Sequence, residues 1–168
     1  YTTIEDCAFA DCKSLKSLVY NQSSYSYANQ AIGSTAFSGC SALETISLPP
    51  PLKTISEYAF QYTGIVNLTI PEGVTSIGKG AFRNCGYLTS VSIPSTVTSI
   101  VASYYNDEGA FQNCAKLQKV TIAEGSKDAY IGKRTFQGCT SLASIEVPGN
   151  YTTIEDCAFA DCKSLKSL

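Results

Sequence analysis

Eight cysteines are the residues of this chain that could most readily do chemistry. Thiolates bind zinc or attack electrophiles, and two thiols can form a disulfide. A zinc site needs a C-x₂₋₄-C pair with two further ligands converging on it. Here Cys7 and Cys12 form a C-x₄-C pair, and the chain contains no histidine that could complete a site. We therefore expect no metal ion and no other cofactor.

Patterns typical of enzymes are absent from the sequence. Without histidine there is no Ser-His-Asp triad, and no G-x-S-x-G, P-loop or G-x-G-x-x-G motif occurs. The sequence also lacks a D-x-D calcium loop. Asp107 and Glu108 form an isolated acidic pair, which we expect to lie in a solvated turn. The sequence predicts a protein that is not an enzyme.

The composition excludes two classes of partner. The net charge is -2, from 12 basic and 14 acidic side chains that are scattered along the chain. A protein that binds nucleic acid needs a basic stripe to neutralise phosphates, and none is visible. No apolar run approaches the roughly 20 residues that span a bilayer. We expect no nucleic-acid partner and no membrane span in this segment.

The cysteines belong to a repeat that is built around phenylalanine. All seven phenylalanines recur at spacings of 22–29 residues in one local pattern. An alanine usually precedes the phenylalanine, an aliphatic residue often lies five positions before it, and a cysteine usually lies three positions after it. Thr63 takes the cysteine position after Phe60. The pattern predicts a core ladder of Phe9, Phe37, Phe60, Phe82, Phe111, Phe136 and Phe159 with Cys12, Cys40, Cys85, Cys114, Cys139 and Cys162.

A short strand follows each of these phenylalanine motifs. The segments LETISL (43–48), LTSVSI (88–93), LQKVTI (117–122) and LASIEV (142–147) alternate apolar and polar residues, and IVNLTI (65–70) is a shortened version. One face of such a strand is apolar, and stacked coils bury it in a parallel sheet. A proline follows most of these segments and ends the strand. The small residue before each phenylalanine favours a short helical or 3₁₀ turn.

Residues 70–94, IPEGVTSIGKGAFRNCGYLTSVSIP, resemble the BspA-like leucine-rich repeat, a cell-surface type. The resemblance covers nearly the whole chain, with two insertions and one deletion. It implies a leucine-rich-repeat solenoid of right-handed coils, each about 22–29 residues long, with a parallel β-sheet. It also implies a location on bacterial or protozoan surfaces, where such proteins are often linked to adhesion to host matrix proteins or other cells.

The chain repeats itself on a longer scale as well. Residues 151–168 are identical to residues 1–18, YTTIEDCAFADCKSLKSL. We interpret residues 1–168 as a single solenoid array, residues 1–150 as one super-repeat of six coils, and residues 151–168 as the start of the next. No polar capping coil is present at either end. We therefore expect coils to continue at both ends, through the same chain or through another molecule.

Two interpretations of the cysteines stay open. The six that follow phenylalanine share one structural column and fit small, buried, reduced core residues. Cys40 and Cys85 flank the Thr63 coil, so they lie about 10 Å apart and cannot form a disulfide. Cys7 and Cys157 stand outside the column. They could form local disulfides with Cys12 and Cys162 if the protein is secreted.

Three N-x-S/T sequons are candidates for N-glycosylation: Asn21, Asn67 and Asn150. Asn21 opens an insertion, Asn150 follows Pro148 in a turn, and Asn67 takes an outward strand position. If the protein is secreted by a eukaryote, we expect a glycan on at least one of them.

The outward strand positions are small and rich in hydroxyl groups. They predict either a solvated face or a flat face for packing against another filament strand or for binding sugars. The aromatic residues of the two insertions, 19–31 and 101–109, have the profile of interface anchors. We therefore name these insertions as candidate contact loops, with Tyr20, Tyr25, Tyr27, Tyr104 and Tyr105.

The sequence leads to two functional hypotheses for an extracellular or cell-surface protein. The first is a structural repeat protein of a filament, fibril or coat, assembled with itself through tandem units or end-to-end stacking. The second is an adhesin module that binds a host or matrix protein through one face or through the tyrosine loops. Repetition of the 150-residue unit favours the first, and the family resemblance favours the second.

Overall fold

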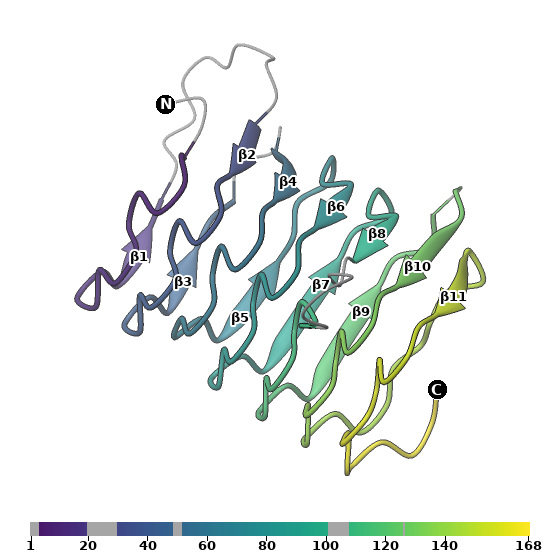
Figure 1. Cartoon of the computed structure of the whole chain (residues 1–168). Coiled ribbons are helices and arrows are strands. Elements are labelled where there is room, and N and C mark those ends of the chain that lie inside the picture. Colours follow the sequence, from purple (N-terminus) through teal and green to yellow (C-terminus); the bar gives the residue numbers. More distant parts are fainter. Residues whose placement is uncertain (1–3, 20–29, 49–51, 101–107, 126) are drawn as a thin grey trace.

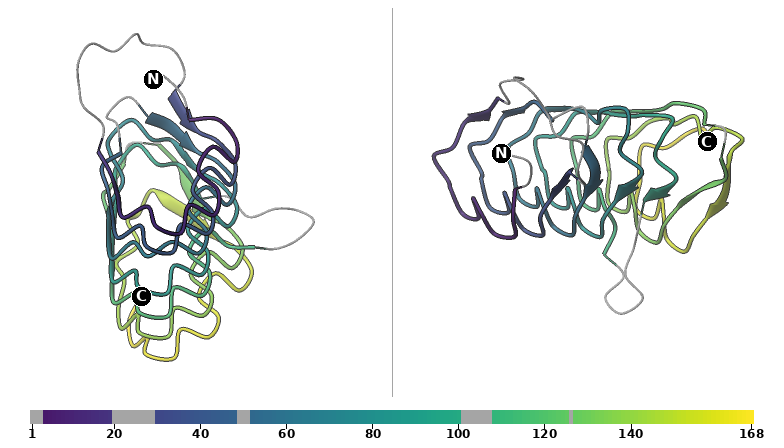
Figure 2. Two further views of the ribbon diagram at one scale, coloured as in Figure 1. Left: turned by 90° about the vertical axis from the view of Figure 1, so that its left-hand side faces the viewer. Right: turned by 90° about the horizontal axis from the view of Figure 1, so that it is seen from above.

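The computed structural model describes residues 4–19, 30–48, 52–100, 108–125 and 127–168. The chain winds in coils that stack in sequence order, so the colours run from purple at one end of the stack to yellow at the other (Figure 1). Viewed along the stack, successive coils lie over one another around a common interior (Figure 2). The fold is the leucine-rich-repeat solenoid that the repeat predicts.

One side of the solenoid is the sheet that the L-x-x-I-x-I segments predict. It consists of a two-stranded and a three-stranded parallel sheet. Apolar strand residues point into the core and polar ones point outward, as in β9, where Val120 and Ile122 are buried between exposed neighbours. This prediction is confirmed. The strands are β1 (Ser17–Leu18), β3 (Thr45–Ile46), β5 (Asn67–Thr69), β7 (Ser90–Ile93) and β9 (Lys119–Ile122).

A second, six-stranded parallel sheet forms another side and was not predicted. Five of its six strands end on the aliphatic residue five positions before a phenylalanine, so that column marks a strand; β8 ends on Ile100, where the second insertion follows. Each coil therefore contributes up to two strands. They are β2 (Gln30–Ile32), β4 (Leu52–Ile55), β6 (Ser76–Ile77), β8 (Ser99–Ile100), β10 (Ala129–Ile131) and β11 (Tyr151–Ile154).

The third side of each coil is the turn around its phenylalanine. Phe37 N–H donates to the carbonyl of Ala59 in the next coil at 2.7 Å, whereas Cys40 N–H donates back to the Phe37 carbonyl at 3.2 Å. Amide groups that bond the next coil cannot also continue a helix. No helix of any kind occurs in the described residues, so the prediction of short helical or 3₁₀ turns is wrong there.

Left-handed backbone conformations allow this turn to close. The residue two positions after each phenylalanine has a φ of 58° to 77°. Glycine, asparagine and aspartate tolerate this conformation best. They occupy six of the seven positions, and Tyr62 is the exception. The seven residues are Asp11, Gly39, Tyr62, Asn84, Asn113, Gly138 and Asp161.

The core is a stack of phenylalanine rings. Neighbouring rings have centroids 5.1–5.5 Å apart and interplanar angles of 2–14°. This spacing is close to the rise of about 4.8 Å between paired strands, so each coil places one ring on the next. The rings of Phe37, Phe60, Phe82, Phe111 and Phe136 are fully buried. Phe9 and Phe159 are only partly buried, because each has a ring on one side alone.

Candidate interaction surfaces

The column of cysteines is part of the backbone hydrogen-bonding of the core. Five thiols donate to the carbonyl of the phenylalanine in the preceding coil, with S···O distances of 3.0–3.3 Å. Burial raises the pKa of the Cys114 and Cys139 thiols, so both stay protonated at neutral pH. A neutral thiol is a poor nucleophile and a poor metal ligand. The five donors are Cys40, Cys85, Cys114, Cys139 and Cys162.

Thr63 replaces the cysteine of its coil without breaking the column. Its hydroxyl donates to the carbonyl of Phe60 at 2.9 Å and lies 3.2 Å from the sulfur of Cys85. The hydroxyl is therefore buried with hydrogen-bond partners, as a buried polar group requires.

Cys12 is exposed, which corrects the prediction that the whole cysteine column is buried. The described residues contain no coil before its own, so nothing covers its sulfur. All eight cysteines are free thiols in the structure. In the second copy Cys157 is exposed and Cys162 is buried, so a bond between them needs the turn to rearrange. The disulfides Cys7–Cys12 and Cys157–Cys162 are absent here and stay predictions for an oxidising environment.

The outward side of β3, β5, β7 and β9 is a polar surface, which we call the hydroxyl face. Its side chains are exposed except that of Ser90, which is half-buried and whose hydroxyl donates to Asn67 Oδ1 at 2.6 Å. Lys119 is its one charged residue. The face consists of Thr45, Ser47, Asn67, Thr69, Ser90, Ser92, Lys119 and Thr121.

The tyrosines named from the insertions, Tyr20, Tyr25, Tyr27, Tyr104 and Tyr105, lie outside the described residues. Two other tyrosines are exposed on the turns and were missed. Tyr62 is 52% exposed and Tyr87 is 58% exposed. The ammonium group of Lys116 lies 4.5 Å from the ring centroid of Tyr87, within the range of a cation–π contact. Their places in the repeat, two after Phe60 and two after Cys85, could have identified them as outward-facing.

Of the acidic pair expected in a solvated turn, Asp107 lies outside the described residues. Glu108 contradicts that expectation, because it belongs to a polar cluster on the phenylalanine side. Its carboxylate lies 3.3 Å from an Arg83 guanidinium nitrogen and accepts a hydrogen bond from the Tyr58 hydroxyl. Lys79 lies over the Tyr58 ring at 5.0 Å. Burial is the main cause that raises the pKa of Tyr58. These residues come from three coils, so no local sequence signal joins them.

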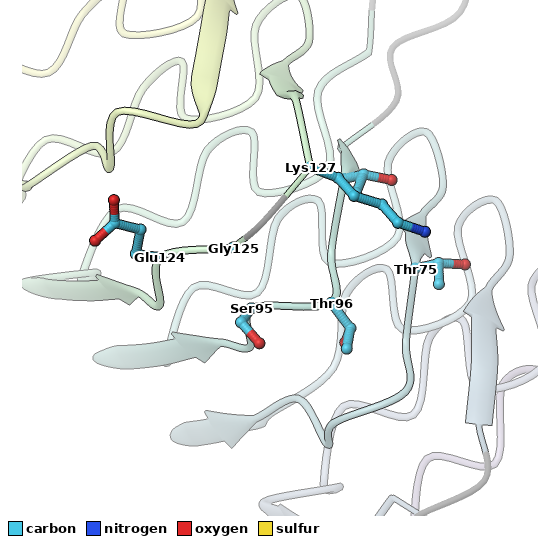
Figure 3. Close-up of a pocket in the computed structure, with 7 residues that line it drawn as sticks. Thr75, Ser95, Thr96, Glu124, Gly125 and Lys127 are labelled. Carbon is cyan, nitrogen blue, oxygen red and sulfur yellow. The ribbon is translucent and has the colours of Figure 1, made fainter.

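A shallow hollow of about 430 Å³ lies where the strands of one sheet lead into the other (Figure 3). Most of its lining residues are polar, and the Thr96 hydroxyl is already engaged, because it donates to the Val74 carbonyl at 2.8 Å and accepts from Gly73 N–H at 3.0 Å. No group of three potential metal ligands comes together in the described part of the chain. The hollow is lined by Thr75, Ser95, Thr96, Thr98, Glu124, Gly125 and Lys127.

The described residues also contain no helix long and apolar enough to cross a membrane.

Of the three sequons, Asn21 lies outside the described residues. Asn67 is exposed on the hydroxyl face, and Asn150 is half-buried in a turn.

The chain is similar to several solved leucine-rich repeat proteins. A T. pallidum leucine-rich repeat protein is 26% identical, with a TM-score of 0.80 over 98% of this chain and 71% of that one. A Bacteroides ovatus leucine-rich repeat protein is 25% identical, with a TM-score of 0.52 over 99% of this chain and 54% of that one. A Eubacterium ventriosum protein of the same description is 25% identical, with a TM-score of 0.51 over 82% and 41%.

Among curated protein sequences none is similar enough to this chain to count as a match. The sequence does match the BspA type leucine rich repeat region, in six copies, over residues 2–108 and 106–168. This match covers nearly all of the chain and agrees with the stacked coils of the structure. The chain therefore belongs to the BspA-type leucine-rich repeat family.

Proposed function

We propose that the chain is a non-enzymatic structural unit of an extracellular or cell-surface filament or coat, in which 150-residue units follow one another as one continuous solenoid. The two identical segments, residues 1–18 and 151–168, carry this proposal. Their packing supports it, because within this chain the first segment has only a following coil as neighbour and the second only a preceding one.

The packing of the two segments is complementary. Ala8 and Cys12 are exposed in the first copy, whereas their equivalents Ala158 and Cys162 are 2% and 8% exposed. The second copy has its own open side, where Ile154 is 43% exposed. A coil with both neighbours would thus be covered on both sides.

The hydrogen bonds at the two sides also fit a single coil. Ile4 pairs with Ile32 of the following coil, and Ile154 pairs with Ile131 of the preceding one. The ring of Phe9 stacks on Phe37 at 5.1 Å, and the ring of Phe159 stacks on Phe136 at 5.4 Å. Joining these two half-environments gives a junction coil that is packed like those inside the unit. At about 4.8 Å per coil, six coils advance about 29 Å.

The denatured, reduced and deglycosylated mass of the native chain tests the covalent form of this proposal. A mass many times that of 150 residues would support tandem units, and electron microscopy should then show rods that lengthen by about 29 Å per unit. If the chain is instead near 17.9 kDa, separate chains must join end to end to form the continuous solenoid. If such a chain stays monomeric at high concentration, the filament proposal is wrong.

An adhesin that binds a host or matrix protein is the second candidate. The exposed Tyr62 and Tyr87, with Lys116 beside Tyr87, favour it, because tyrosine supplies a large contact area with a polar tip. The double variant Tyr62→Ser, Tyr87→Ser should lose at least tenfold in affinity for immobilised matrix protein if these residues are anchors. Unchanged binding would remove the argument for this surface.

A further inference from the structure

Two of the three sequons lie among the described residues, and their side-chain amides differ in one decisive respect. N-glycosylation joins a sugar to the amide nitrogen of asparagine and leaves the amide oxygen in place. A folded chain can therefore carry the glycan only where that nitrogen faces open space. The hydrogen bonds and close contacts of Asn67 and Asn150 decide which of the two meets this condition.

The amide oxygen of Asn67 is held by hydrogen bonds, whereas its amide nitrogen faces outward. The side chain is exposed on β5, and its Oδ1 accepts hydrogen bonds from Thr89 Oγ1 at 3.1 Å and from Ser90 Oγ at 2.6 Å. Both donors come from the following coil, so they fix the amide group without using its nitrogen. The sequon hydroxyl of Thr69 is exposed on the same face of the strand.

Asn150 uses both ends of its amide inside the fold. Its Nδ2 donates to the Lys127 carbonyl at 3.0 Å, and its Oδ1 accepts from Gly125 N–H at 3.2 Å. A Cβ atom placed on Gly125 would lie only 3.1 Å from that nitrogen. The nitrogen is therefore packed against the backbone of the neighbouring coil, and a sugar at this position would displace it.

We propose that Asn67 is an N-glycosylation site and that Asn150 is not. In the transfer, Asn67 Nδ2 bonds to the anomeric carbon of an oligosaccharide carried on a lipid pyrophosphate. The bond from that carbon to the pyrophosphate oxygen breaks, the lipid pyrophosphate leaves, and the amide nitrogen gives up one proton. The hydrogen bonds to Oδ1 survive, because the reaction takes place at the nitrogen.

The position of the glycan has a consequence for the hydroxyl face. A branched sugar on β5 would cover the neighbouring polar side chains, including Thr69 and Ser92, and would keep a second solenoid from packing against them. If units follow one another as proposed above, these glycans recur every six coils, about 29 Å apart. The spacing rests on the proposed function, but the site itself does not.

Peptide mapping of the native chain tests the proposal, because cleavage after lysine and arginine places each sequon on its own peptide. Asn67 falls on residues 54–79, Asn150 on residues 135–163 and Asn21 on residues 17–53. Mass spectrometry before and after removal of N-linked sugars should show a glycan on the 54–79 peptide and none on the 135–163 peptide. A bare 54–79 peptide, or a glycan on Asn150, would overturn the proposal.

Two matched variants show that the glycan depends on the sequon. Thr69→Ala and Thr152→Ala each remove the hydroxyl of one sequon and keep its asparagine, and both threonines are exposed. Thr69→Ala should lose the glycan from the 54–79 peptide completely, whereas Thr152→Ala should leave the glycan pattern unchanged. A glycan that persists in Thr69→Ala would contradict sequon-dependent modification. Each result is independent of chain mass and rod length, so it stands apart from the test of the proposed function.

Discussion

The phenylalanine stack makes the cost of losing one ring depend on its place along the solenoid. We predict that Phe82→Ala destabilises the chain far more than Phe9→Ala. The Phe82 ring is fully buried and stacks on Phe60 and Phe111, with centroid distances of 5.2 Å on both sides. The Phe9 ring is partly buried and stacks on Phe37 alone, at 5.1 Å.

These environments give the expected magnitudes. Truncation of a fully buried phenylalanine to alanine costs about 3–5 kcal/mol in free energy of unfolding, and each stacked pair adds about 0.5–1.5 kcal/mol beyond area burial. Phe82→Ala removes two stacked pairs, so we expect a loss of about 5 kcal/mol. Phe9→Ala removes one pair and a ring that is only partly buried, for which about 2 kcal/mol is expected.

Urea titration followed by circular dichroism measures both losses. Phe82→Leu is the matched control: it keeps most of the apolar volume and should lose about 1.5 kcal/mol or less. Because repeat arrays can unfold in parts, the unfolding transition followed by circular dichroism should also be compared with the transition followed by tyrosine fluorescence. If Phe9→Ala and Phe82→Ala agree within about 1 kcal/mol, the ring stack does not stabilise the chain in the way argued here.

Three further predictions concern the interior. Thr63→Val should lower the free energy of unfolding by about 1 kcal/mol, because the Phe60 carbonyl loses a hydrogen bond. The control Thr63→Cys should be nearly neutral. Urea titration measures both, and an unchanged free energy in Thr63→Val would contradict the prediction. Burial raises the pKa of Tyr151 to about 12, so above pH 10 the unfolded chain releases this proton before the folded one does. Stability should therefore fall between pH 10 and 12 by about 2–3 kcal/mol, and the fall should be smaller by that amount in Tyr151→Phe. Equal pH dependence of the two chains would refute this. Under reducing conditions a thiol reagent should modify three cysteines in the folded chain and all eight after unfolding; early reaction of any other thiol would argue against the buried column. The three are Cys7, Cys12 and Cys157.

Much of the fold could be predicted from the spacing of a few residue types. The phenylalanine column, the buried cysteines after it and the strands of the L-x-x-I-x-I segments all follow from local patterns that recur in each coil. The second sheet was missed although its marker, the aliphatic residue five positions before phenylalanine, had been noted. In segments of the second sheet such as VTSI (74–77 and 97–100), the apolar residues lie three positions apart, so these segments lack the period-2 alternation that identifies a strand from sequence.

The candidate surfaces were harder to predict, because their residues come from different coils. Glu108 meets Arg83 and Tyr58 only after coils of unequal length stack in register. The same holds for Asn150, whose amide bonds Lys127 and Gly125 of the coil before it. Insertions change the spacing between such partners along the chain, so no fixed interval in the sequence identifies them.

The sequence by itself determined the repeat, the class of fold and the residues that fill the core. These depend on patterns within one coil, where spacing along the chain equals position in space. Only the tertiary structure decided which polar groups meet between coils, which turns adopt left-handed conformations, and which of two identical segments buries its cysteine. Those properties depend on the neighbouring coil, and residues 1–18 and 151–168 show this directly: their sequences are identical, and their burial differs because their neighbours lie on opposite sides.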